Sequence, residues 1–172
     1  MNDSYVEKSI DSGRIGAAVE HLVAASCILA SGGALNVSTS LVDDEGVDLV
    51  FHRRGSPTTL AVQVKSRSKD TSVVQRGQFV AYVRPQTFSP RRGLYMLFVV
   101  VDRPTATLET VWLVPSDEFD ALAGTTGRGL RRITASLKPD SRDQWRRFRM
   151  PLQELPGAIL EALDQLDNPT AV

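Results

Sequence analysis

Residues 60–70 read LAVQVKSRSKD and describe a strand with two unlike faces. The leucine and the valines fall at alternate positions on one side, which is the pattern of a strand packed against a core. Gln63 and Lys65 fall on the other side, two residues apart. A valine-rich strand that places an amide and an ammonium on one face needs an explanation beyond packing.

The segments on either side of this strand predict a tight meander. Two strands joined by a short turn pair antiparallel, so Asp48, near the start of one, should lie close to Gln63 and Lys65 at the far end of the next. The meander comprises a strand ALNVSTSLV (34–42), a turn DDEG (43–46), a strand VDLVFHR (47–53), a turn RGSP (54–57) and a strand TTLAVQVKS (58–66).

Helical and extended patterns occupy the rest of the chain. A helix is expected from about residue 14, with Asp11 or Ser12 as its cap, up to the glycine pair 32–33. Because helices and strands are interleaved, the pattern predicts an α/β fold with a mixed sheet and helices at its faces. The other expected elements are strands at 79–83, 94–102, 109–115 and 130–137, a short helix starting at Pro115-Ser116, and a terminal amphipathic helix over 151–167.

A carboxylate, an amide oxygen and an ammonium that converge can serve metal-assisted hydrolysis. Hard oxygen ligands hold Mg²⁺, which polarises a phosphodiester and lowers the pKa of a bound water. An ammonium beside them can orient that water or stabilise charge that grows on the phosphate. Asp48, Gln63 and Lys65 are the residues that the meander would bring together.

A helix that bears Glu20, then G-V-D on a strand, then V-Q-V-K-S on the next, resembles the PD-(D/E)XK nuclease superfamily. The resemblance implies a restriction-endonuclease-like fold, α/β with a central mixed sheet flanked by helices, and a Mg²⁺-dependent endonuclease that hydrolyses DNA, with Mn²⁺ as a substitute. It implies that Asp48, Gln63 and Glu20 bind the metal and that Lys65 assists the water.

Two positions depart from the pattern of the superfamily. Val47 stands where many members have proline, and Gln63 stands where the motif has Asp or Glu, as in the similar Mrr-type branch. An amide supplies a dipole in place of a full charge, so metal affinity should fall. A second hypothesis therefore stays open: a catalytically inactive nuclease fold that acts as a nucleic-acid-binding or protein-binding module.

Length and composition set the frame for both hypotheses. The 172 residues suit a single nuclease-like domain (1–172), with a core over 13–124 and a C-terminal strand and helix over 130–167. The one cysteine excludes an internal disulfide framework and a cysteine-based zinc cluster. We find no secretory signal pattern, and the longest apolar run, 94–101, is too short to cross a bilayer, so a cytoplasmic protein without membrane association is expected.

Charge is unevenly distributed although the net charge is zero. Residues 1–50 carry a net charge of −6 and residues 51–100 carry +8. Ser66, Arg67 and Lys69 could hold DNA phosphates, although a solvated edge strand is an equally good interpretation. Cleavage of both strands of a duplex favours a homodimer, and RNA is possible as a substrate. Among the aromatic residues, Trp112 is expected in the core, whereas Trp145, among arginines, is a candidate to pack on a base or a partner.

Overall fold

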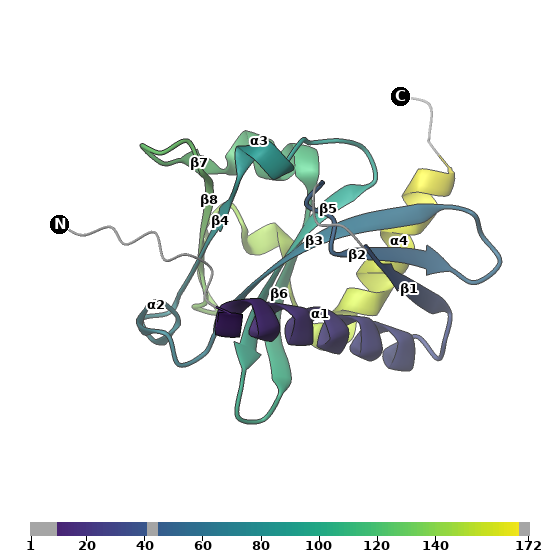
Figure 1. Ribbon diagram of the computed structural model, residues 1–172, viewed down its shortest axis with the longest axis horizontal. Helices are drawn as coiled ribbons and strands as arrows, with labels where there is room; N and C mark the ends of the chain where they lie inside the picture. The colour runs from purple at the N-terminus through teal and green to yellow at the C-terminus, as the bar shows by residue number, and fades with distance from the viewer. Residues whose placement is uncertain (1–9, 41–44, 169–172) are drawn as a thin grey trace.

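The computed structural model describes residues 10–40 and 45–168, so the end of the expected strand 34–42 and the first half of the expected turn 43–46 lie outside the described residues. The chain forms an α/β fold around a mixed sheet, as predicted (Figure 1). Helices α1 (Ile10–Ala30) and α4 (Leu155–Asp167) pack on one face of this sheet. A second, smaller sheet and the short helix α3 (Ser116–Leu122) cover the other face.

The central sheet has six strands, and only the pairing of β3 with β5 is parallel. The strand over 94–102 was expected at the centre, and β5 does lie between β3 and β6. β2 pairs antiparallel with β3 and places Leu49 opposite Val62, which confirms the predicted meander. In spatial order the strands are β1 (Leu35–Thr39), β2 (Leu49–Arg53), β3 (Thr59–Ser68), β5 (Leu94–Asp102), β6 (Thr107–Pro115) and β9 (Arg149–Pro151).

The second sheet joins segments that are far apart in the chain. β4 pairs with β8 along its whole length, and β8 then pairs with β7. The sequence analysis expected β4 and β8 as strands but not as a separate sheet. The remaining elements are β4 (Gln78–Val83), β7 (Gly124–Thr125), β8 (Arg131–Ser136), the helical turn α2 (Ser72–Gln75), and the 3-10 turns η1 (Pro85–Thr87), η2 (Arg146–Phe148) and η3 (Leu152–Glu154).

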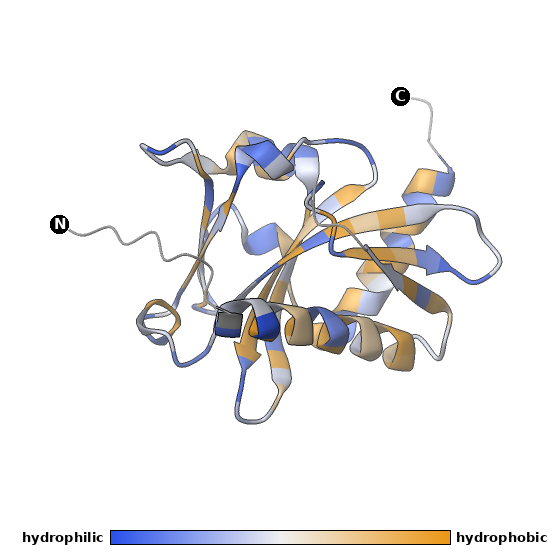
Figure 2. Ribbon diagram, in the orientation of Figure 1, coloured by the Kyte–Doolittle hydropathy of each residue, from blue (hydrophilic) through white to orange (hydrophobic). Residues whose placement is uncertain are grey.

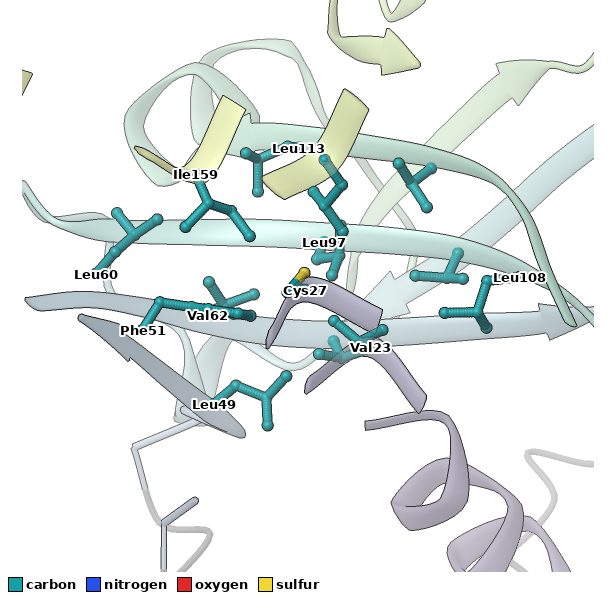
Figure 3. Packing of buried hydrophobic residues seen from close by; sticks show 14 of the residues in the cluster. Val23, Cys27, Leu49, Phe51, Leu60, Val62, Leu97, Leu108, Leu113 and Ile159 are labelled. Atoms are coloured by element: carbon teal, nitrogen blue, oxygen red, sulfur yellow. The ribbon is translucent and has the colours of Figure 1, made fainter. Parts of the chain in front are cut away.

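The first apolar cluster lies between the central sheet and helices α1 and α4. Val23 and Cys27 of α1 point at β-strand residues such as Leu49 and Val62, with Ile159 of α4 beside them (Figure 3). Burial raises the pKa of the Cys27 thiol to about 12. By length and composition α1 also suffices to cross a membrane. Only Val19, Val23 and Cys27 of this helix are buried in the cluster, and Leu29 is 80% exposed. Hydrophilic and hydrophobic residues are interspersed along the helix (Figure 2).

Helix α1 begins at Ile10, earlier than expected, so Asp11 lies in its first turn and does not precede the helix. A carboxylate in the first turn still interacts favourably with the positive end of the helix dipole. The terminal helix begins later than expected, at Leu155, because residues 149–154 first form β9 and the turn η3. Both differences are shifts of a helix boundary and leave the packing faces unchanged.

The second apolar cluster fills the space between the two sheets and α3. Trp112 is fully buried there, as predicted, and its ring lies 5.0 Å from that of Phe79. Trp145 is only 2% exposed and belongs to the same cluster, next to Phe119. The expectation that Trp145 packs on a base or a partner was wrong, because its ring faces inward while the neighbouring arginines face solvent.

Candidate functional site

Asp48 lies at the point where β2 begins, and its carboxylate completes the pairing of β3. The Asp48 N–H donates to the carbonyl of Val62 at 2.9 Å, and the Val64 N–H donates to Asp48 Oδ2 at 2.6 Å. The side chain therefore takes the place that a backbone carbonyl would have in a longer strand. This bond fixes the carboxylate between the positions of Gln63 and Lys65 on the neighbouring strand.

Gln63 is buried, with 4% of its surface exposed, although it is polar. Its side-chain oxygen Oε1 is buried and accepts no hydrogen bond from any residue that the structure describes. An unsatisfied buried acceptor costs about 1–3 kcal/mol, and such groups usually indicate a missing water, ion or ligand. By the register of β2 and β3, Gln63 faces Asp48 across the pair, so the unsatisfied oxygen and the carboxylate belong to one site.

Gly46 packs closely against the Gln63 side chain and against Thr87, which lies in the segment after β4. A Cβ on Gly46 would lie 2.3 Å from the carbonyl oxygen of Thr87 and 2.7 Å from Nε2 of Gln63, so no other residue fits. Its φ of +65° also suits glycine. This glycine belongs to the G-V-D motif, but the motif did not predict a role for it. Nothing in the local sequence pattern predicted that Thr87 would lie next to it.

Lys65 lies two residues after Gln63 on β3 and shares its side of the strand. It is half-buried, and it is held by an interaction within the protein. Glu20 is half-buried on α1, which packs against β3 and β1 from the other face of the sheet. The structure thus brings Asp48, Gln63 and Lys65 to one end of the β2–β3 pair, and it places Glu20 on the helix one layer away.

The three residues expected to hold phosphates already make contacts within the protein. Arg67 donates from Nε to the carbonyl of Val80 at 2.7 Å and from NH1 to the carbonyl of Ser66 at 3.1 Å. Lys69 forms ion pairs with Glu109 at 2.6 Å and with Asp102 at 3.6 Å, which raise the pKa of its ammonium. Arg67 therefore links β3 to β4, whereas Lys69 links the end of β3 to the β5–β6 hairpin.

The donor set of this site suits a hard divalent cation better than zinc. Within residues 10–40 and 45–168, no cluster of three or more histidine, cysteine, aspartate or glutamate side chains is placed to hold a metal. Asp48 and the unsatisfied Gln63 Oε1 offer one charged and one neutral oxygen. Oxygen ligands of this kind suit Mg²⁺ and Mn²⁺, and the low charge predicts weak binding.

The described residues thus form a six-stranded mixed sheet with α1 and α4 on one face and the candidate site at one end of the β2–β3 pair. No protein-family model matches the chain, and no curated protein matches it. Among solved structures, the chain is similar to a bacterial homing endonuclease, I-Ssp6803I, with a TM-score of 0.54 and 19% sequence identity. The match covers 90% of this chain and 96% of that chain. At this identity the likeness concerns the fold, and it confirms the predicted α/β architecture.

Proposed function

We propose that the protein is a metal-dependent endonuclease of the PD-(D/E)XK type that hydrolyses phosphodiester bonds in DNA. One observation carries the proposal: Gln63 has a buried side-chain oxygen without a partner among the described residues, and it directly precedes Val64, whose N–H holds the Asp48 carboxylate at the end of β2–β3. The fold shared with a homing endonuclease supports the same reading.

In this proposal Asp48 and Gln63 would hold Mg²⁺, and Glu20, on the helix one layer away, would contribute through a water. The bound ion supplies charge neutralisation and a water of lowered pKa. The residues of the chain position these ligands. The Val64 N–H fixes the Asp48 carboxylate, and Gly46 with the Thr87 carbonyl restricts the Gln63 amide. The Lys65 ammonium orients the water or stabilises the charge on the phosphate.

DNA is the proposed substrate, and RNA would be served by the same groups. Because one site cuts one strand, cleavage of both strands of a duplex favours two copies, and we propose a homodimer on that ground. A cytoplasmic location without membrane association remains a prediction from the sequence.

A second candidate function is an inactive nuclease fold that binds nucleic acid or protein. It is favoured by Gln63 in place of a carboxylate and by the small number of acidic groups at the site among residues 10–40 and 45–168. The two functions differ in metal binding, which a calorimetric titration with Mn²⁺ measures. An inactive module should bind no Mn²⁺ at millimolar concentration, whereas the endonuclease should bind it.

Nicking of supercoiled plasmid with Mg²⁺ or Mn²⁺ tests the proposed activity. Asp48→Asn keeps a hydrogen-bond acceptor for Val64 but removes the charge, so cleavage should fall about 100-fold or more with the fold intact. Asp140→Asn is the matched control, because Asp140 is an exposed carboxylate. Equal cleavage by Asp48→Asn and the parent would refute the proposal, as would the absence of cleavage by the parent on a broad panel of DNA.

A further inference from the structure

The outer face of the second sheet carries a cluster of positive charge without acidic residues. Residues 78–84 and 124–136, which form β4, β7, β8 and their turns, contain four arginines and no aspartate or glutamate. These strands lie on the side of the molecule away from α4 (Figure 1). Such an arrangement on a sheet favours a polyanion as its partner.

Strand alternation decides which side chains face outward. Phe79, Ala81 and Val83 of β4 are buried against the second core, so Tyr82 lies on the outer face, where it is 43% exposed. Arg132 of β8 is directly opposite Tyr82 in the β4–β8 register and is exposed. Side chains directly opposite across strands are neighbours, so an aromatic ring and a guanidinium lie side by side.

Arg67 connects this face with the candidate metal site. Gln63, Lys65 and Arg67 occupy alternate positions on β3 and share one side of the strand. Each step of two residues advances about 6.6 Å. At the end of this row Arg67 donates to the carbonyl of Val80 on β4, and it lies near enough to Tyr82 for the two to interact electrostatically.

Two further arginines extend the surface. Arg84 directly follows β4, and Arg128 lies in the turn between β7 and β8; both are exposed. The side chain of Arg131 is only 21% exposed, so Arg131 does not belong to this surface. The arginine face is therefore defined as Tyr82, Arg84, Arg128 and Arg132, and Arg67 lies between this face and the candidate metal site.

We propose that the arginine face binds the backbone of the double-stranded DNA whose hydrolysis is proposed above. Three features select this partner: the charge is of one sign, arginine forks match phosphate oxygens, and the row along β3 leads from the face to the metal site. The surface positions the duplex, and the site at Asp48 and Gln63 acts on it.

Binding without metal tests this proposal separately from cleavage. Fluorescence anisotropy with a labelled 30-base-pair duplex in EDTA should show that Arg84→Ala with Arg132→Ala weakens binding about tenfold or more. The slope of log affinity against log salt should fall by about 2, because each arginine that neutralises a phosphate contributes close to one. Arg54→Ala, an exposed arginine on the β2–β3 turn, is the matched control and should bind as the parent does.

Circular dichroism and thermal unfolding should show that the double variant keeps the parental fold, because both side chains are exposed. Parental affinity in the double variant would overturn the arginine face even if the protein cleaves DNA. An equal loss in Arg54→Ala, or equal competition by polyglutamate or single-stranded RNA, would overturn it as well. Weakened duplex binding in a protein that never cleaves would support the face and refute only the nuclease.

Discussion

The two sides of the ten-residue strand β3 differ in their side chains and in what those side chains contact. On one side, Leu60, Val62 and Val64 are buried in the cluster beneath α1 and α4. On the other side, Gln63 is buried without a partner for its oxygen among the described residues, and Lys65 and Arg67 follow it. The first side holds the fold together, and the second leaves the Gln63 oxygen without a hydrogen bond among the described residues, at a cost in stability. Substitutions on the two sides should therefore separate stability from activity.

Leu60→Ala should have the largest effect on stability, because it opens a cavity on the apolar side. Leu60 is fully buried, and such truncations cost about 2–5 kcal/mol of unfolding free energy. Urea unfolding followed by circular dichroism measures the change. A loss below about 1 kcal/mol would show that the cluster beneath α1 and α4 is loosely packed.

Gly46→Ala should come next, with its damage on the polar side. The left-handed backbone costs about 1–2 kcal/mol with a Cβ, and the clash with the Thr87 carbonyl adds to that. The loop after β4 must move, so Mn²⁺ affinity should fall together with stability. Calorimetric titration and urea unfolding check both quantities. Gly127→Ala serves as the control, since a Cβ there meets nothing within 4 Å.

Cys27 makes the apolar side sensitive to alkaline pH. The thiol ionises near pH 9.0 when exposed and near 12 when buried, so the folded state holds its proton more tightly. Stability is then undiminished below pH 9 and falls by about 1.4 kcal/mol per pH unit between 9 and 12. Cys27→Ala should remove this part of the slope. Parallel unfolding curves at pH 8, 9 and 10 for both proteins give the comparison, and identical slopes would contradict it.

Gln63→Leu should have the smallest effect on stability, despite full burial. It removes the unsatisfied oxygen and keeps most of the volume, so the unfolding free energy should change by less than about 1 kcal/mol. The parent should gain thermal stability in millimolar Mn²⁺, because a ligand that binds only the folded state stabilises it. The variant should gain none. A Mn²⁺-dependent shift of equal size in both would rule out Gln63 as a ligand.

Local pattern was sufficient to predict the meander, because turns of a few residues fix the register of β2 against β3. Hence the approach of Asp48 to Gln63 followed from the sequence alone. The second sheet did not, since β4 and β8 are about 50 residues apart in the chain and no short-range signal reports their pairing. For the same reason, the sequence did not predict that the Trp145 ring faces the core or that the Thr87 carbonyl lies next to Gly46.

The bond from the Val64 N–H to the Asp48 carboxylate places position 48 under two selections at once. Under the proposed function, a descendant of this chain without cleavage activity would still need an oxygen there, because otherwise the end of β3 loses its partner. Such a descendant should keep Asp or drift to Asn at 48, while Lys65 is free to diverge. The lysine is therefore the better marker of activity among distant copies of this fold.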